Sequence, residues 1–251
     1  MTNLDGRIAW VTGAGTGIGE AGAVALARDG MTVVLTGRRR EPLEAVAKRI
    51  AADGGKALVE PADVADAAAV RRAADAIKAA FGRLDVLVNN AGLNVAERRW
   101  RNLQPESIQK IIGANLTGAF LVAQAALPLM RLTGGVMIHT ASWAGRFIGP
   151  VSGPAYMAAK HGVVAMSHSL NLEEGRNGIR SSVLCPGEVA TPILAHRSPP
   201  EKPEDIARML QSEDMGELIA FVARQPPHVC INEVVISPTH NRGYLKLMEG
   251  R

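Results

Sequence analysis

The stretch Thr12-Gly13-Ala14-Gly15-Thr16-Gly17-Ile18-Gly19 decides the fold of this chain. An apolar run over residues 7–12 predicts a buried strand before it, and an Ala-rich run over residues 17–29 predicts a helix after it. Glycines at such a strand-to-helix turn let the backbone approach a pyrophosphate, whose charge meets the N–H groups of the helix. A plain tight turn is the alternative, but the position between a first strand and a helix favours a dinucleotide site.

The same alternation of short apolar runs and Ala-rich helical runs continues along the chain. Further strands are predicted at residues 32–36, 56–60, 84–89, 136–140, 179–185 and 231–237. Further helices are predicted at residues 41–53, 66–81, 105–132, 154–176 and 212–224. We therefore expect a single α/β domain over residues 1–251, with a Rossmann-like, doubly wound, seven-stranded and mostly parallel sheet that carries helices on both faces. A TIM barrel is the competing fold, and the glycine turn argues against it.

The composition is that of an ordinary globular protein, with 47% hydrophobic and 21% charged residues among 251. The formal charge of +4 gathers only in short clusters at residues 38–40 and 98–101, too short for a nucleic-acid-binding arm. Cys185 and Cys230 lack metal-ligand spacing, so we expect no metal site and no disulfide. We find no signal-peptide pattern and no apolar run near the ~20 residues that cross a bilayer, so we expect a cytoplasmic protein.

The end of the second predicted strand bears on the choice of cofactor. A site for NAD places a carboxylate there, which accepts hydrogen bonds from the ribose. This chain has Gly37 in that place, followed by Arg38, Arg39 and Arg40. An arginine would pair with a 2′-phosphate, so the sequence favours NADP(H). For Arg39 and Arg40, a solvated loop at the start of a helix is the alternative.

Tyr156 and Lys160 stand four residues apart in a predicted helix whose first turn holds Pro154. The two side chains therefore share one face of that helix. A tyrosine has a reference pKa of about 10, and an ammonium one turn away favours the phenolate and lowers that pKa. The pair suits acid–base chemistry near neutral pH.

Other polar residues are predicted near the same edge of the sheet. Ser142 follows the fifth predicted strand, and its hydroxyl would donate to a substrate oxygen whose charge grows during the reaction. Asn89-Asn90-Ala91-Gly92 ends the fourth strand at the carboxyl edge, where doubly wound folds bind ligands. Asn115 lies in an apolar predicted helix, and a structural hydrogen bond is the simplest interpretation of its amide.

Together these residues resemble the short-chain dehydrogenase/reductase family over nearly the whole chain. The family pattern appears in order as TGAGTGIG, ADV at residues 62–64, NNAG, Asn115, Ser142, YMAAK and PGEVATP at residues 186–192. The resemblance implies an NADP(H)-dependent oxidoreductase that interconverts a secondary alcohol or hydroxy acid and its carbonyl by hydride transfer. It also implies a homodimer or homotetramer, joined through the helices that contain Asn115 and Tyr156.

The resemblance further implies a role for each matching residue. Tyr156 would donate a proton in reduction and accept one in oxidation, while Lys160 would lower its pKa and hold the nicotinamide ribose. Ser142 would orient the substrate oxygen, and Asn115 would hold a water in a proton relay through Lys160. The implied cofactor-binding residues are Gly13, Thr16, Gly17, Ile18, Gly19, Arg38, Asp63, Val64, Asn90, Ala91, Gly92, Tyr156, Lys160, Pro186, Gly187, Val189 and Thr191.

Some features depart from the family pattern. The interval from Ser142 to Tyr156 is one residue longer than the commonest spacing, which leaves Thr140 as a weaker alternative to the serine. Thr16 stands where some NADP-type members add a basic residue. Residues 231–241, INEVVISPTHN, lack a glycine-rich turn and are similar to NADP-dependent serine and 3-hydroxy acid dehydrogenases.

The substrate side is less defined. Residues 195–210 match the place of a mobile substrate lid, and residues 238–251 would form a tail. We expect four residues either to form an apolar wall of the pocket or to pack in the core or the lid: Leu93, Trp143, Val151 and Ile193. Arg146 and His196 would either bind a substrate carboxylate or, more simply, be exposed to solvent.

Other functions stay open beside a reductase of a small hydroxy or carbonyl compound. The same fold would serve a non-catalytic dinucleotide-binding regulator, or an NAD-preferring dehydrogenase. The pI near 9.3 suggests a binder of nucleic acid or of a membrane surface, and we expect neither as a partner.

Overall fold

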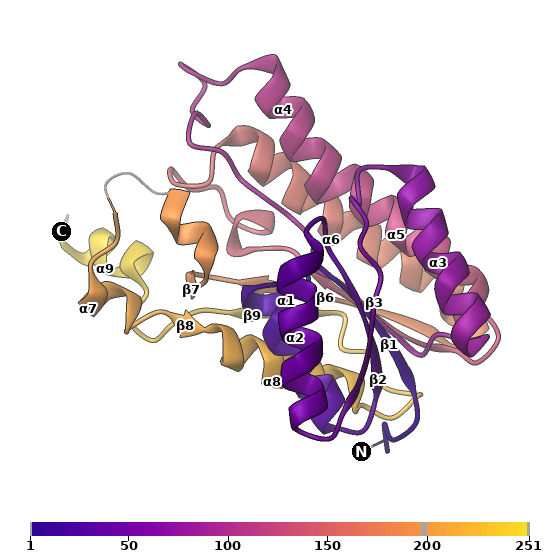
Figure 1. Cartoon of the computed structure of the whole chain (residues 1–251). Coiled ribbons are helices and arrows are strands. Elements are labelled where there is room, and N and C mark those ends of the chain that lie inside the picture. Colours follow the sequence, from indigo (N-terminus) through magenta and orange to yellow (C-terminus); the bar gives the residue numbers. More distant parts are fainter. Residues whose placement is uncertain (1, 197–199, 250–251) are drawn as a thin grey trace.

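The computed structural model describes residues 2–196 and 200–249, and a seven-stranded parallel sheet runs through its centre (Figure 1). Its strands are β1 (Ile8–Thr12), β2 (Thr32–Thr36), β3 (Lys56–Val59), β4 (Val86–Asn89), β5 (Gly135–Thr140), β6 (Ile179–Pro186) and β9 (Glu233–Ile236). They lie in the order β3-β2-β1-β4-β5-β6-β9, and every neighbouring pair is parallel. The predicted doubly wound sheet is confirmed.

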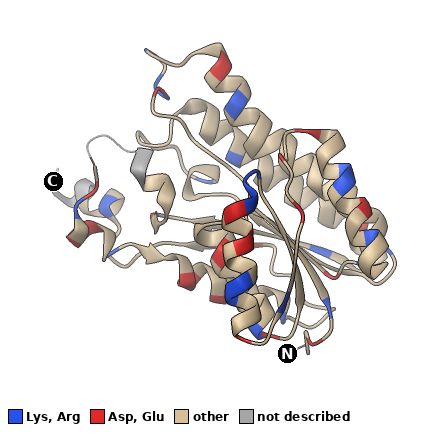
Figure 2. Cartoon of the chain, viewed as in Figure 1, with Lys and Arg blue, Asp and Glu red and all other residues tan. Residues whose placement is uncertain are grey.

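Helices cover both faces of the sheet, because successive strand residues point to opposite sides. On one face lie α1 (Gly17–Arg28), α2 (Arg40–Ala52) and α8 (Ser212–Ala223), whose apolar residues pack with Val11 of β1. On the other lie α3 (Ala67–Phe81), α5 (Gly118–Met130) and α6 (Pro154–Glu174), and there Trp10 packs with α3 and α5. Figure 2 shows charged residues mainly on the helices and loops around a sheet that is almost entirely tan.

The chain reverses its direction of winding at β1. In the register, Val11 of β1 lies between Leu35 of β2 and Val88 of β4. From β1 the chain builds β2 and β3 outward on one side, then returns to add β4, β5, β6 and β9 on the other. The loops that leave β1 and β4 therefore diverge, which opens a crevice at the carboxyl ends of these two strands.

The predicted helix over residues 105–132 is interrupted by a wider turn. The structure has α4 (Pro105–Ile112), then a π-helical turn over Gly113–Thr117, then α5. Asn115 lies in this turn, and its side-chain amide donates to the carbonyl oxygen of Ile111 at 2.9 Å. Hydrophobic periodicity does not reveal such a turn, because the flanking residues are apolar on either side.

One helical run, Pro105–Met130, is long and apolar enough to cross a membrane by length and composition alone, with a mean hydropathy of 1.5. The prediction that no run approaches this length is therefore wrong. The run is apolar because part of it is covered: Val122, Ala126 and Met130 are buried, and α5 packs against α3. A helix in the core of a protein passes the same test.

Several short elements lie between or after the main ones, and two of them, the strands β7 (Val189–Ala190) and β8 (Leu210–Gln211), were not predicted from the sequence. They form a separate parallel pair, too short to leave a period-2 pattern. The expected lid over residues 195–210 holds α7 (Pro203–Ile206), and its residues 197–199 lie outside the described part. The expected tail holds α9 (Arg242–Glu249). Short turns of 3-10 helix lie at Trp143–Gly145, Gly175–Asn177 and Pro192–His196.

Candidate active site

The glycine turn between β1 and α1 depends on the absence of side chains. Gly13 and Gly17 have φ of +65° and +60°, a region that favours glycine. A Cβ on Gly19 would lie 2.2 Å from the carbonyl oxygen of Gly13, so α1 approaches the turn too closely for any side chain there. Gly19 therefore allows the first turn of α1 to pack directly against the backbone of Gly13.

The ends of β1 and β4 are joined by a small hydrogen-bond network. The Thr12 hydroxyl accepts from the backbone N–H groups of Asn90 and Ala91, at 3.0 and 3.1 Å. The side-chain amide of Asn90 donates in return to the carbonyl oxygen of Thr12 at 3.1 Å. This network holds the two diverging loops at the crevice. No role for Thr12 was predicted from the sequence, although its place just before the first glycine is a usable signal.

Two cavities open beside the glycine turn, a larger one of about 640 Å³ and a smaller one of about 260 Å³. Gly13, Thr16, Ala91, Gly92 and Leu93 line both. The predicted residues that line only the larger cavity are Gly17, Ile18, Asn90, Asn115, Ser142, Tyr156, Lys160, Pro186, Gly187, Val189 and Thr191. Those that line only the smaller cavity are Arg38, Asp63 and Val64. Of the predicted site residues, Gly19 lines neither.

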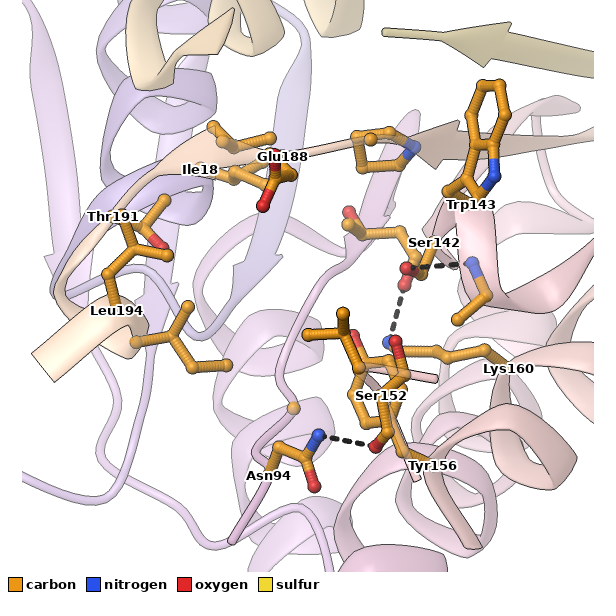
Figure 3. Close-up of a pocket in the computed structure, with 18 of the residues that line it drawn as sticks. Ile18, Asn94, Ser142, Trp143, Ser152, Tyr156, Lys160, Glu188, Thr191 and Leu194 are labelled. Atoms are coloured by element: carbon orange, nitrogen blue, oxygen red, sulfur yellow. Dashed lines mark hydrogen bonds between the residues drawn. The ribbon is translucent and has the colours of Figure 1, made fainter. Parts of the chain in front are cut away.

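Ser142, Tyr156 and Lys160 meet at one end of the larger cavity (Figure 3). Tyr156 and Lys160 come from the first turns of α6, and Lys160 Nζ lies 5.6 Å from the centre of the Tyr156 ring. Ser142 follows β5, where its hydroxyl accepts a hydrogen bond from the N–H of Ala144 at 3.1 Å. Lys160 Nζ donates to the carbonyl oxygen of Thr140 at 2.8 Å. Two segments, α6 and the loop after β5, thus bring a hydroxyl, a phenol and an ammonium together.

Burial dominates the acid–base properties of these groups. It raises the pKa of Tyr156 above its ordinary value, and the hydrogen bond with Ser142 offsets only part of this. Burial lowers the pKa of Lys160 to about 8. The sequence predicts that Lys160 lowers the pKa of Tyr156. In the structure the loss of solvent around the phenol outweighs any such effect.

Asn115 is buried, and its amide group is bonded to backbone. Its Nδ2 donates to the carbonyl oxygens of Leu93, at 2.7 Å, and of Ile111, while its Oδ1 accepts from the N–H of Leu93 at 3.3 Å. A Cβ on Gly92 would lie 2.6 Å from that Oδ1. The structural hydrogen bonding expected of Asn115 is present, and it fixes the loop after β4 at the cavity wall.

The smaller cavity lies at the end of β2 and has basic residues on its wall. Arg38 and Arg39 line it beside Gly37. The helix α4 contributes Gln109 and Lys110 to the same lining, and neither was predicted because they lie far along the chain from the glycine turn.

Beyond the glycine turn, the larger cavity is lined by both apolar and polar side chains. The wall includes the four predicted residues Leu93, Trp143, Val151 and Ile193. The residues that the sequence analysis missed are Asn94, Arg98, Phe147, Ser152, Glu188, Leu194, Glu201, Asn241 and Arg242. Glu188 follows the Pro-Gly pair of the family pattern directly, which was a usable signal. Figure 3 shows Ile18, Thr191 and Leu194 across the cavity from Ser142 and Lys160.

Other candidates lie elsewhere. Arg146 pairs with Glu233 at 2.8 Å and does not line the larger cavity. The side chain of His196 lies outside the described part of the chain. Cys185 and Cys230 are free thiols, and residues 2–196 and 200–249 contain no cluster of three potential metal ligands among His, Cys, Asp and Glu.

Comparison with known proteins agrees with this geometry. A family model for short chain dehydrogenases matches residues 7–202. The chain is 34% identical over 239 residues to an uncharacterized oxidoreductase of Staphylococcus aureus (strain USA300), an alignment that covers 95% of this chain and 100% of that protein.

Two solved structures have closely similar folds. An alcohol dehydrogenase from the archaeon Thermococcus sibiricus, complexed with 5-hydroxy-NADP, superposes with a TM-score of 0.85 at 29% identity, over 94% of this chain and 98% of that one. A carveol dehydrogenase from Mycobacterium avium, in complex with NAD, superposes with a TM-score of 0.86 at 25% identity, over 94% and 98%.

Proposed function

The chain belongs to the short-chain dehydrogenase family, and on this premise we propose that it interconverts a secondary alcohol, or a hydroxy acid, and its carbonyl with NADP(H). The observation that carries the proposal is the meeting of Ser142, Tyr156 and Lys160 in one cavity, whose wall continues to the glycine turn. A hydroxyl, a phenol and an ammonium at such a place suit proton transfer to or from a reacting oxygen.

The residues present fit a nicotinamide dinucleotide. Gly13 and Gly17 leave the cavity wall free of side chains where the helix N-terminus would meet a pyrophosphate. Two cavities meet at this turn, which suits a dinucleotide whose nicotinamide half would lie in the larger cavity and whose adenosine half would lie in the smaller one. When bound, the dinucleotide supplies or accepts the hydride. Gly13, Thr16, Gly17 and Ile18 would hold its centre, while Pro186, Gly187, Val189 and Thr191 would line its nicotinamide end.

In the proposed mechanism the Tyr156 hydroxyl gives its proton to the carbonyl oxygen during reduction and takes it back during oxidation. The raised pKa of Tyr156 favours the protonated form that reduction needs. Ser142 would donate to the same oxygen as its negative charge grows. Lys160 would hold the nicotinamide ribose, and Asn115 a water that returns the proton through Lys160.

The preference for NADP(H) rests on the smaller cavity. Arg38 and Arg39 line it, and Gly37 stands where a carboxylate would bind the ribose of NAD. The two solved structures described above hold 5-hydroxy-NADP and NAD, so likeness to them does not choose between the cofactors. Asp63 and Val64, which line the same cavity, would lie beside the adenine.

We further propose that the chain acts as a homodimer or homotetramer in the cytoplasm. Apolar side chains are exposed on three consecutive helices: Ile108 on α4, Phe120 on α5 and Leu172 on α6 are 39%, 52% and 86% exposed. Phe120→Glu is expected to shift the mass measured by light scattering toward the monomer. A wild-type protein that is monomeric at all concentrations would contradict this part of the proposal.

The substrate lid stays a proposal for residues 195–210, and Glu201 of this segment lines the larger cavity. Proteolysis with and without NADPH plus a substrate analogue tests it. Cleavage in this segment should slow when both ligands are bound.

The test of the proposed function is oxidation of NADPH and NADH with a panel of aldehydes, ketones and 3-oxo acids, followed by absorbance. We expect turnover that prefers NADPH and falls by at least about 10³-fold in Tyr156→Phe, because the phenol oxygen is the proton donor. Tight NADPH binding without turnover on any compound would instead favour a non-catalytic regulator. Turnover that survives in Tyr156→Phe would overturn the assignment of the acid.

A further inference from the structure

The helix α9 lies at the larger cavity, although it comes last in the described chain. Asn241, Arg242 and Gly243, at its start, line this cavity. Arg242 Nε donates to Glu188 Oε2 at 2.7 Å, and Arg242 Nη1 donates to Glu201 Oε2 at 2.7 Å. Glu188 follows β6 and Glu201 lies before α7, so these bonds fasten the start of α9 to two other segments of the cavity wall.

The first turn of α9 brings Tyr244 onto Trp143. The two rings meet edge-on, with centres 5.6 Å apart and planes at 71°. Trp143 also packs on Phe147, with ring centres 4.5 Å apart. We call these three side chains the aromatic cluster. Ring pairs of this kind stabilise a structure by more than the area they bury would, so the cluster holds the indole of Trp143 in place.

The aromatic cluster lies beside the acid–base groups. Trp143 directly follows Ser142, and both side chains line the larger cavity, as does Phe147. Figure 3 shows Trp143 on the same side of the cavity as Ser142, across from Leu194. A substrate whose reacting oxygen lies at Ser142 and Tyr156 would therefore have a group attached to its carbonyl carbon near the cluster.

Apolar side chains of this wall are exposed at the cavity. Phe147, Val151 and Ile193 are 45%, 51% and 41% exposed, and all three line it. Single exposed apolar residues are ordinary on a protein surface, but several gathered at one concave site indicate an apolar ligand. A ring would gain ring-to-ring contacts with the cluster that an alkyl chain does not make, and it would lose less rotational freedom on binding.

We infer that the aromatic cluster binds an apolar ring of the substrate, and that Tyr244 supports this specificity by holding Trp143 in place. This substrate class rests on the proposed function and narrows it to ketones, or the matching secondary alcohols, with a ring within a few bonds of the reacting carbon. Trp143 and Phe147 would contact the ring. Tyr244 does not line the cavity, so it is a positioning residue that acts through Trp143.

Pairs of uncharged ketones with similar hydrophobicity test this substrate class: 4-phenyl-2-butanone with 2-octanone, and 5-phenyl-2-pentanone with 2-nonanone. Neither ring is conjugated to the carbonyl group, so the two members of a pair have similar intrinsic reactivity. Burial of apolar area alone would favour neither member. We expect kcat/KM for reduction to be at least about threefold higher for the ring ketone of each pair, chiefly through a lower KM.

Two kinds of failure can be told apart. Equal or poorer reduction of the ring ketones, including none at all while other carbonyl compounds are reduced, would overturn the substrate class and leave the proposed function standing. If no carbonyl compound is reduced and no alcohol oxidised with either NADPH or NADH, the proposed function fails and the substrate class fails with it.

Variants locate the ring preference in the aromatic cluster. Trp143→Leu should lower the ring-to-chain ratio of kcat/KM to about 1, and Tyr244→Leu should lower it at least about twofold. Tyr244→Phe keeps the edge-on ring and should leave the ratio unchanged. Leu245→Ala is the matched control, because Leu245 is the exposed neighbour of Tyr244 on the same helix, and it should leave the ratio unchanged as well.

Phe147→Leu tests the cluster at an exposed side chain, whose replacement puts the fold at little risk, and it should also lower the ratio. A merely structural cluster would lower kcat/KM for both members of each pair alike. An unchanged ratio in Trp143→Leu and Phe147→Leu would therefore overturn the ring site, and an unchanged ratio in Tyr244→Leu would overturn the positioning role of Tyr244.

Discussion

Lys160 donates a hydrogen bond from its ammonium group to the carbonyl oxygen of Thr140 across 2.8 Å, and only 4% of Lys160 is exposed. Thr140 ends β5 just before Ser142, so this bond joins α6 to the segment that carries the serine. Burying an ammonium costs free energy, and the lowered pKa of Lys160 is the sign of that cost. A helix and a strand end are thus held at the candidate active site at the expense of stability.

Lys160→Met should therefore change stability in a way that depends on pH. The pKa of Lys160 is about 8 in the folded protein against an ordinary value of 10.5, so between these values the unfolded chain binds the extra proton. The wild-type free energy of unfolding then rises with pH relative to that of the variant. The difference, variant minus wild type, should fall by about 3 kcal/mol from pH 7 to pH 10.5. Urea unfolding measures it, and a difference that is constant with pH would contradict the buried charge.

Arg38→Gln should weaken the preference for NADPH. Losing a charge-assisted pair with a phosphate costs about 1.5 to 3 kcal/mol, so kcat/KM for NADPH should fall by about 10- to 100-fold while that for NADH changes little. Arg40→Gln is the matched control, because Arg40 pairs with Glu44 at 3.6 Å and does not line the smaller cavity. An equal fall in kcat/KM with both cofactors would show that Arg38 does not bind the 2′-phosphate.

Gly19→Ala should damage the glycine turn more than Gly22→Ala in the same helix. The new Cβ at Gly19 would meet backbone, 2.2 Å from the oxygen of Gly13. At Gly22 it would meet the far end of the Ile219 side chain at 2.8 Å, which shifts more easily than backbone does. We expect affinity for NADPH, measured by fluorescence titration, to fall more than about tenfold in the first variant and less than about threefold in the second. The reverse order would mean that α1 does not abut the turn as described.

Glu174→Gln should destabilise the protein at neutral pH but not in strong acid. Glu174 is buried at the end of α6, where it accepts hydrogen bonds from Arg131 and Asn177. Arg131, and then Asn177, hold its pKa at about 2, below the ordinary 4.5. The stabilising effect is therefore present above pH 4.5 and lost as pH falls toward 2. We expect a loss of about 2 kcal/mol at pH 7, measured by urea unfolding.

Glu173→Gln is the control for that experiment, since Glu173 is the exposed neighbour on the same helix. It should leave stability nearly unchanged at every pH. A Glu174→Gln deficit that is as large at pH 2.5 as at pH 7 would point to packing in place of charge.

The sequence was sufficient for the sheet because burial leaves a local trace in it. Trp10 and Val11 face opposite cores, so β1 reads as continuously apolar, and the residues 33–35 of β2 and 86–88 of β4 repeat this pattern. The approach of Tyr156 to Ser142 was predictable too, since both follow from family motifs placed at one edge of the sheet. The sequence could not show whether burial or the charge of Lys160 has the larger effect on the pKa of Tyr156. That comparison depends on how much solvent the fold removes from around the phenol.

Contacts between remote segments leave no such trace. Arg242 donates hydrogen bonds to Glu188 and Glu201, which lie 54 and 41 residues earlier in the chain. Loops bring these residues together, and hydrophobic periodicity does not predict the course of a loop. An arginine near the end of a sequence is therefore most simply interpreted as exposed to solvent. The π-helical turn at Asn115 and the pairing of β7 with β8 are missed for the same reason. The prediction that no apolar run approaches the ~20 residues that cross a bilayer is wrong, because residues 111–130 within Pro105–Met130 contain no charged side chain.

The position of Arg242 also bears on the order in which the two sides of the site are synthesised. The glycine turn and the strands β1 to β5 leave the ribosome well before α9, and domains begin to fold as they emerge. A nascent chain would therefore form the crevice at β1 and β4 before Arg242 is available to donate to Glu188 and Glu201. Until α9 docks, the larger cavity lacks the wall residues Asn241 and Arg242, so a partly made chain would have the crevice beside the glycine turn but an incomplete larger cavity.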